Sequence, residues 1–356
     1  MEEDSFEFLR TLVETPSPSG YEEENLMNWR DRVEGHAEKI EADSYGNTTA
    51  TLNPGCDTSV VLTGHSDEIS FMVRHITEEG FIYVQRVGGM DVGVAQGQRV
   101  VIHGREGPVK GVVGRKAIHL QEDEDKEEQP DLEDIYIDIG AENEEEVREA
   151  GVHVGATATY NVGLDRLQGD VVAGRALDNR IGIWAAAEAF LAIDPSELDV
   201  TVHAVATVQE EVGLKGATMV SYSLNPDVAL VVDVTHATDN PDTSFKKYGK
   251  VEMGEGPVLK HGRENHPLVN EHLREIAEGR GIPLQEETMS TRGGTDADAF
   301  FVSRGGIPST SVGVPNRYMH TTAELIDLKD LEGVRELFAG FAESLNGGED
   351  FRKTPF

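Results

Sequence analysis

The sequence predicts an α/β protein whose mixed central sheet is flanked by helices and interrupted by a small β domain. Two runs, 199–208 and 227–234, are almost continuously apolar, as expected for strands buried on both faces. Between about 70 and 164 the pattern changes to short β-branched runs separated by Gly-rich turns, which is typical of a small antiparallel barrel or sandwich. With 356 residues, the chain exceeds what one compact core usually holds. We therefore expect a larger domain of residues 1–69 and 165–356 and an inserted β domain of residues 70–164.

Apolar periodicity and turn residues place the elements of the larger domain. Phe6, Leu9 and Leu12 fall on one face of a helix expected over residues 4–14, and the TPSPSG turn leads into a second helix. Gly281 ends a later helix, since glycine readily adopts the left-handed conformation found at helix ends. The other elements expected here are strands over 59–63 and 307–315 and helices over 176–193, 266–281 and 327–345.

The inserted segment is expected to consist mostly of short strands. Apolar, β-branched runs occur at 71–76, 80–87, 98–104, 107–114, 116–120, 132–140 and 154–160. A short Glu-rich helix is expected over 143–151, and the acidic tract 121–131 indicates a solvated loop. Several short strands joined by Gly-containing turns favour a closed or sandwich-like β structure.

The chain is strongly acidic, with 31 Lys and Arg against 66 Asp and Glu, a formal net charge of −35. A surface with this charge repels itself in dilute buffer, and salt screens the repulsion because the Debye length falls to about 3 Å at 1 M. We therefore expect a salt-adapted, halophilic source, with an ordinary acidic enzyme as the alternative. The same charge argues against nucleic acid and anionic membranes as partners.

Cysteine usage and hydropathy predict a soluble, cytoplasmic protein. Cys56 is the only cysteine, so the chain cannot form an intrachain disulfide. The acidic segment 1–14 lacks the basic and apolar regions of a secretory leader. No apolar run in the sequence approaches the ~20 residues that cross a bilayer.

Five short apolar runs each lead into a potential metal ligand. These ligands are two histidines and three carboxylates: His65, Asp178, Glu211, Asp233 and His320. Such donors are accepted by pairs of Zn²⁺, Co²⁺ or Mn²⁺ ions. Because the ligands are spread from residue 65 to residue 320, only a folded sheet could bring them together. We therefore expect two divalent metal ions per subunit.

Most of these candidates lie at the ends of predicted strands, where open α/β sheets bind their ligands. His65 follows one apolar strand, and Asp67, two residues later, can hold its second ring nitrogen. Glu210 and Glu211 follow another strand, and adjacent residues leaving a strand point to different sides. One of these two carboxylates can therefore bind metal while the other takes a proton from bound water.

Each candidate also has an ordinary alternative role. A His-x-Asp pair is common on protein surfaces, and two adjacent glutamates mean little in so acidic a chain. Asp178 could cap its helix, Asp233 could end a strand in a turn, and His320 could be a loop histidine. His236, three residues after Asp233, is the nearest competitor for a role in the site. These ordinary roles do not account for all five ligand candidates occurring in this order.

Six motifs occur in order along nearly the whole chain: GHSDEI, ALDNR, QEEVGLKGA, VVDVT, RGGTDADAF and GVPNRYMHT. With these motifs the sequence resembles the tetrahedral (TET) aminopeptidase family of dinuclear metallopeptidases. The resemblance implies a zinc-peptidase-like catalytic domain and a PDZ-like inserted domain that mediates dimerisation. It also implies a homo-dodecamer, a hollow tetrahedron built from dimers, that acts on peptide substrates.

The resemblance further implies a role for each site residue. The ligands of one metal would be His65, Asp178 and Asp233, and those of the other Asp178, Glu211 and His320, so that Asp178 bridges the two. Glu210 would be the general base, and Asp67 would orient a histidine ligand. Thr295 and Asp296 would lie near the substrate. The implied activity is the removal of N-terminal residues from peptides by a metal-activated water.

Other functions remain open at this point. A deblocking enzyme, an N-acyl amino acid deacylase or a carboxypeptidase could use the same metals, and Arg292 or Arg317 could bind a substrate carboxylate. An endoglucanase would use paired carboxylates but would not need two histidines, and a non-catalytic shell protein would not need Glu210. The sequence leaves open the physiological metal, the preferred first residue of the substrate, and assembly with sister subunits.

Overall fold

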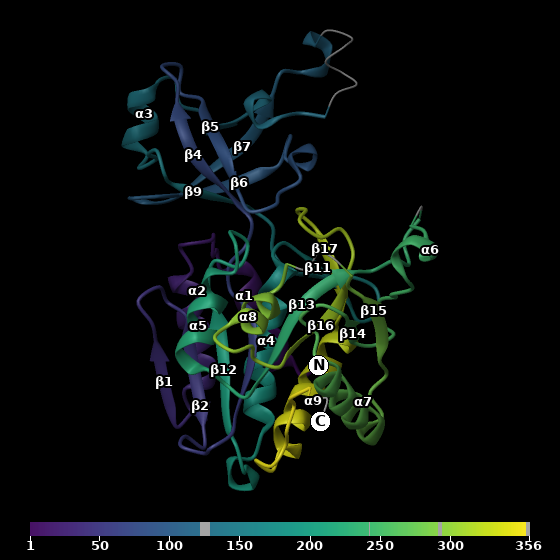
Figure 1. The fold of residues 1–356 in the computed structure, drawn as a ribbon. Helices are drawn as coiled ribbons and strands as arrows, with labels where there is room; N and C mark the ends of the chain where they lie inside the picture. The colour runs from purple at the N-terminus through teal and green to yellow at the C-terminus, as the bar shows by residue number, and fades with distance from the viewer. Residues whose placement is uncertain (122–128, 242, 291–293, 354–356) are drawn as a thin grey trace.

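The protein consists of a helix-covered mixed sheet and a closed β-barrel that stands above the sheet in Figure 1. The computed structural model describes residues 1–121, 129–241, 243–290 and 294–353. The barrel is formed by the chain between the third strand of the sheet and its return to the sheet. The expected fold class, a mixed sheet with an inserted small β-barrel, is confirmed.

The central sheet has the strand order β1-β2-β12-β3-β13-β16-β14-β15. Its strands are β1 (Lys39–Ala42), β2 (Thr48–Leu52), β3 (Ser59–His65), β12 (Thr201–Thr207), β13 (Val228–His236), β14 (Val258–His261), β15 (Gln285–Thr288) and β16 (Ser309–Asn316). The neighbours β12, β3, β13 and β16 are parallel, so their carboxyl ends meet at one end of the sheet. These four strands are almost entirely buried, as their apolar sequences predict.

Helices cover both faces of the sheet. One face packs against α1 (Glu3–Glu14), α2 (Glu23–Val33), α4 (Leu177–Ala192), α7 (Pro267–Arg280) and α9 (Leu328–Ser344), and the other against α5 (Lys215–Leu224) and α8 (Asp296–Val302). Successive strand residues alternate between these faces, so that Leu62 packs into the first core and Val61 into the second. None of the helices in the described ranges is both long and apolar enough to cross a membrane.

The central helix α4 lies directly on strand β3. A Cβ atom at Gly64 would lie only 2.5 Å from the carbonyl carbon of Gly182. The two glycines therefore let the backbones of β3 and α4 approach each other at the residue before His65. This close approach brings the start of α4 to the carboxyl ends of the parallel strands.

The barrel has the closed order β4-β5-β8-β7-β6-β9 and its own apolar core. Its strands are β4 (Ser70–Ile76), β5 (Ile82–Val87), β6 (Arg99–Gly104), β7 (Gly107–Arg115), β8 (Ile135–Asp138) and β9 (Thr157–Tyr160), with α3 (Glu144–Glu149) between the last two. A small sheet of β10 (Asp165–Arg166), β11 (Val171–Gly174) and β17 (Glu324–Asp327) follows it. The short helix α6 (Phe245–Tyr248) lies between β13 and β14.

Two expectations in the barrel segment need correction. The strand expected over 116–120 is wrong, because a 3₁₀ turn occupies Ile118–Leu120. The side chains of Ile118 and Leu120 are 59% and 68% exposed, so this apolar pattern does not mark a buried strand. The strand expected over 132–140 is shorter, since a 3₁₀ turn at Leu132–Asp134 precedes β8. Of the acidic tract 121–131, residues 122–128 lie outside the described residues.

Candidate metal centre

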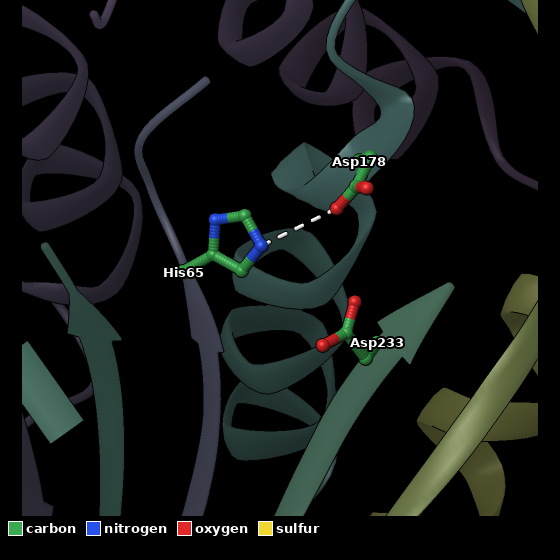
Figure 2. A group of neighbouring side chains, drawn as sticks. All are labelled: His65, Asp178 and Asp233. Carbon is green, nitrogen blue, oxygen red and sulfur yellow. Dashed lines mark ion pairs between the residues drawn. The ribbon is translucent and has the colours of Figure 1, made fainter. Parts of the chain in front are cut away.

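The carboxyl ends of two parallel strands bring His65 and Asp233 together beside the start of α4. His65 is the last residue of β3, and Asp233 lies in the neighbouring strand β13. With Asp178 they form a group, here called the inner triad, whose ligand atoms all lie within 4.8 Å of one another (Figure 2). The Nε2 atom of His65 lies 3.3 Å from Oδ1 of Asp178. All three side chains are buried.

A second group, the outer triad, shares Asp178 and adds Glu211 and His320, again with ligand atoms within 4.8 Å of one another. The Nε2 atom of His320 lies 3.2 Å from Oδ2 of Asp178 and 3.6 Å from Oε1 of Glu211. Asp178 thus presents one carboxylate oxygen to each histidine. The side chain of His320 is 32% exposed, compared with 2% for His65, so the outer triad lies closer to solvent.

Asp178 is not the N-cap of its helix. Asp178 and Asn179 have non-helical backbone angles, and the regular part of α4 begins after them. The side-chain oxygen of Asn179 accepts a hydrogen bond from the N–H of Gly182 at 2.9 Å, which is the contact that an N-cap residue makes. The carboxylate of Asp178 instead faces the two histidines.

Asp67 connects His65 to the loop that carries the two glutamates. The Nδ1 atom of His65 lies 3.3 Å from Oδ1 of Asp67 and 3.1 Å from its carbonyl oxygen. The same carboxylate accepts hydrogen bonds from the N–H groups of Glu210, at 2.8 Å, and Glu211, at 3.2 Å. The hydroxyl of Ser19 donates another at 2.6 Å. Asp67 therefore fixes the His65 ring and the start of the glutamate loop together.

Glu210 lies beside the inner triad without belonging to it. Its Oε2 atom is 3.8 Å from Nε2 of His65, and its side chain is buried. Burial raises the pKa of Glu210 to about 10, and the charges of Asp233, Asp296 and Glu211 contribute to that increase while His65 opposes it. A carboxyl group in this environment binds a proton readily and needs nearby positive charge to release it.

The ligand carboxyl groups are buried close to one another, and their charges act on each other's pKa values. Burial raises the pKa of Glu211 to about 8 and that of Asp233 to about 7, with Asp178 contributing to both. The hydrogen bond to Asp178 raises the pKa of His320 to about 10. Burial would raise the pKa of Asp178, but its contacts with His320 and His65 lower it below its ordinary value. The negative charge gathered here favours binding of cations.

This donor set fits divalent metal ions. Oxygen Oε1 of Glu211 is buried and has no hydrogen-bond partner among the described residues. A buried carboxylate oxygen is costly unless it is paired or bound to a cation. In each triad, imidazole nitrogens and carboxylate oxygens lie close enough to bind one ion. These are donor atoms that zinc, cobalt and manganese accept.

Glu324 is a site residue that the sequence did not predict. It is buried at the start of β17, and its carboxylate accepts hydrogen bonds from the N–H groups of Asp178, at 2.9 Å, and His320, at 2.8 Å. It therefore connects the backbones of two outer-triad residues. Its place four residues after His320 was the only signal, and that signal is weak in a chain with 66 acidic residues.

A second unpredicted group supports the loop after His65. The carboxylate of Glu68 pairs with Arg175 and, at 2.9 Å, with Arg180. Arg180 also donates to the carbonyl oxygens of Ser66 and Leu12. All three charged side chains are buried, and the two arginines flank the segment that carries Asp178. The arginines and Glu68 therefore connect the loop after His65 to the start of α4.

Asp296, Thr295 and His236 are the remaining candidates. Asp296, at the start of α8, accepts a hydrogen bond from the hydroxyl of Thr207, and its charge acts on Glu210. Asp296 and its neighbour Thr295 are almost fully buried. His236 is exposed at the end of β13 and belongs to neither triad.

Arg292 and Arg317 are the candidates for binding the free carboxylate of a carboxypeptidase substrate. Arg317 is already paired with Asp239 through two contacts, Nε to Oδ1 at 2.9 Å and Nη2 to Oδ2 at 2.5 Å. Arg292 lies outside the described residues. The paired state of Arg317 weakens the carboxypeptidase alternative, because its guanidinium group already has a carboxylate partner.

Two overlapping histidine–carboxylate triads beside the ends of the parallel strands, with a buried glutamate next to them, are typical of a metallohydrolase. Comparison with known proteins is more specific, since the family model described as M42 glutamyl aminopeptidase matches residues 46–337. The chain belongs to this M42 family, and it is a metallo-aminopeptidase.

The similarity extends over nearly the whole chain. The protein is 32% identical to the lysyl aminopeptidase of Pyrococcus furiosus over 344 residues, which are 96% of this chain and 97% of that relative. A TET aminopeptidase from a thaumarchaeote of marine sediment has a TM-score of 0.91 and 34% identity, covering 97% of each chain. The TET1 peptidase of Pyrococcus horikoshii, which can assemble into a tetrahedron or a large octahedral shell, has a TM-score of 0.85 and 31% identity over 96% of this chain and 100% of that one. The resemblance to TET aminopeptidases is therefore confirmed.

Proposed function

We propose that this metallo-aminopeptidase holds two divalent metal ions and removes N-terminal residues from peptides. Glu210 is the general base of this reaction. The observation that carries this proposal is the position of Asp178. Its two carboxylate oxygens lie 3.3 Å from a nitrogen of His65 and 3.2 Å from a nitrogen of His320. A carboxylate shared by two ligand sets is suited to bridge the ions of a two-metal site.

The proposed ligands are the members of the two triads. His65, Asp178 and Asp233 would hold one ion, and Asp178, Glu211 and His320 would hold the other. Zinc, cobalt and manganese all suit these donors. Bound there, the ions would supply a water of lowered pKa and polarise the scissile carbonyl group.

Glu210 is placed to move the proton of the reaction. Its backbone is held by Asp67, and its carboxylate lies against the inner triad without belonging to it. Glu210 takes the proton of the attacking water and returns it to the leaving amine. Divalent ions held at the triads would lower the pKa of Glu210 from its raised value of about 10, so that its carboxylate could accept and release a proton near neutral pH.

The charge around the site supports a substrate bound by its N-terminus. Besides the proposed ligands, Glu210 and Asp296 bring two further acidic side chains to the site. Negatively charged groups attract the α-ammonium group of a peptide. Arg317 is paired with Asp239 and so offers little to a free substrate carboxylate. We propose that Asp296, whose charge acts on Glu210, and its neighbour Thr295 lie near the first substrate residue.

The test is the release of free amino acids from an unblocked peptide and from its N-acetylated twin, with Zn²⁺ or Co²⁺ and with or without chelator. We expect stepwise release from the unblocked peptide only, abolished by the chelator. Cleavage of the blocked peptide would instead indicate a deblocking enzyme or deacylase. If neither peptide is cleaved while metal is bound, the endoglucanase and shell-protein alternatives return.

We further propose that residues 1–69 and 165–356 form the catalytic domain and that residues 70–164 form a dimerisation domain. Dimers formed through the barrel would assemble into a homo-dodecamer. The support is the similarity to the Pyrococcus horikoshii TET1 peptidase, whose chains can form a tetrahedron. Light scattering distinguishes a dodecamer from a dimer or monomer by mass.

Adaptation to high salt is a separate proposal that rests on the net charge of −35. In dilute buffer this charge repels itself within and between subunits, and concentrated salt screens it. We expect transfer from molar salt to dilute buffer to lower the activity or dissociate the assembly, as followed by peptide cleavage and light scattering. Equal activity and equal mass at both salt concentrations would identify an ordinary acidic enzyme.

A further inference from the structure

The outer triad is in contact with the inserted barrel, through a turn of two glycines. Strand β5 ends at Val87, and Gly88 and Gly89 follow it. The Nδ1 atom of His320 lies 2.8 Å from the carbonyl oxygen of Gly89. This contact joins two residues that are 231 positions apart in the chain. The barrel, which stands above the sheet in Figure 1, therefore reaches the candidate metal centre.

The contact with Gly89 determines which nitrogen of His320 can bind metal. A backbone carbonyl accepts hydrogen bonds only, so Nδ1 must carry the proton and donate it. In the neutral imidazole, which is the form that binds metal, the other nitrogen, Nε2, then has a lone pair, and it is this atom that lies 3.2 Å from Asp178. In metal sites such a partner fixes the tautomer and the orientation of the ring. His65 receives the equivalent contact from Asp67, which lies two residues later in the chain.

The two glycines also leave room that any other residue would fill. A Cβ atom at Gly89 would lie 3.2 Å from Nδ1 and 3.3 Å from Cε1 of His320. A Cβ atom at Gly88 would lie 3.3 Å from both Cβ and Oε2 of Glu211 and 2.8 Å from Ile69. The turn is thus fitted against both residues that only the outer triad contains.

The turn is anchored in the barrel core. Met90, the next residue, is 4% exposed within that core. The hydroxyl of Tyr160, on strand β9, donates to the sulfur of Met90 at 3.5 Å. Asp91 accepts a hydrogen bond from the N–H of Gly93 at 2.8 Å and so fixes the turn that follows. A shift of the barrel would therefore move the carbonyl oxygen of Gly89 relative to His320.

We propose that the Gly88–Gly89 turn is a positioning element of the metal centre, through which the inserted barrel sets the metal affinity of the outer triad. The inference rests on the proposed two-metal function. It assigns to the barrel a role in the active centre in addition to the dimerisation proposed above. The inner triad, held from within the sheet domain by Asp67, does not depend on this turn.

The test compares alanine substitutions at the two glycines with matched controls in the full-length protein. Gly88 has a φ of +81°, and Gly97, also in the barrel, has the same φ with nothing within 4 Å of a built Cβ atom. Gly88→Ala and Gly97→Ala therefore carry similar backbone strain, and only the first crowds Glu211. For Gly89→Ala, which adds no positive-φ strain, the control is Gly305→Ala, where a Cβ atom also meets nothing within 4 Å.

The measurement is Zn²⁺ affinity by competition with a chromogenic chelator, together with metal counting and thermal unfolding of the metal-depleted proteins. We expect Gly88→Ala and Gly89→Ala to weaken one of two zinc sites by about 10- to 100-fold, as loss of a ligand-orienting contact typically does. The other site and both controls should match the wild type.

Two results would overturn the inference. The first is retention of both zinc affinities in Gly88→Ala and Gly89→Ala. The second is equal weakening of both sites together with a lowered unfolding temperature, which would show a general effect on folding. Because zinc binding is measured without peptide, a wild-type protein that binds two zinc ions and cleaves nothing would contradict the proposed aminopeptidase mechanism while leaving this inference intact.

Discussion

The inner and outer triads share Asp178, but their other ligands come from different kinds of structural element. The inner triad adds His65 and Asp233, which lie in neighbouring parallel strands and are almost fully buried. The outer triad adds Glu211 and His320, which lie in loops beyond β12 and β16, and His320 is 32% exposed. One site is thus part of the sheet, while the other is assembled where loops and the barrel meet.

The difference lies in how each histidine is held. His65 is oriented by Asp67, two residues later in the chain, so the segment that ends β3 supplies both groups. His320 has a left-handed backbone conformation with a φ of +63° and is held by groups distant in the chain or in a different strand. These groups are the carboxylate of Glu324 and the carbonyl oxygen of Gly89. We therefore expect the inner triad to be the more rigid site and the outer triad the more adjustable one.

Removing the shared ligand should have the largest effect, because it damages both triads at once. Asp178→Ala is expected to release at least one metal and to lower kcat/KM by more than the ~10²–10⁴-fold attributed to a single acid–base group. Metal counting and peptide cleavage measure the two effects, and Asp165→Ala at an exposed position is the control. Retention of two metals in Asp178→Ala would refute the bridging role.

Replacing the proposed base, Glu210, should lower the rate of peptide cleavage without releasing metal. Glu210→Gln keeps the shape of the side chain but removes the proton acceptor, so kcat is expected to fall by about 10²–10⁴-fold. Because Glu210 belongs to neither triad, both metals should stay bound. The exposed Glu278→Gln on α7 is the control. An unchanged kcat would remove Glu210 as the base, and loss of a metal would make it a ligand.

Glu324→Gln is expected to have a smaller effect that falls mainly on the outer triad. Glutamine retains one oxygen acceptor, so it can keep only one of the hydrogen bonds to the N–H groups of Asp178 and His320. Loss of such a supporting contact typically costs about 10- to 100-fold in metal affinity. Chelator competition would measure it, again beside Glu278→Gln. A loss of metal affinity confined to the inner triad would contradict the expected dependence of the outer triad on Glu324.

The same division explains which parts of the site could be predicted from the sequence. His65 ends the apolar strand β3, and Asp233 lies within the apolar strand β13, so each polar residue is conspicuous in its apolar run and could be predicted as a candidate. Asp178 was found as a ligand candidate, but only the structure shows that Asn179 takes over the capping role. The Gly88–Gly89 turn left no signal, because it acts through a backbone carbonyl and through the absence of side chains.

The fold follows a similar rule. The parallel core strands were predictable because burial on both faces requires continuous apolar sequence. The outer strands β1 and β15 were missed, since KIEA and QEET are short, largely polar and exposed, and only pairing with a neighbour makes them strands. The apolar run at 116–120 gave the opposite error, because its exposed side chains pack into no core.

The smallest expected effect is the difference in affinity between the two metals of the wild-type protein. Oxygen Oε1 of Glu211 is buried, but the histidine beside it is 32% exposed, so a chelator and water reach the outer triad more easily than the inner one. We expect chelator titration to remove the metals in two steps separated by at least about tenfold in affinity, or about 1.4 kcal/mol. His320→Ala should lack the weaker step and retain the stronger one. A single step that removes both metals would mean that their shared ligand, Asp178, couples the sites more strongly than their surroundings separate them.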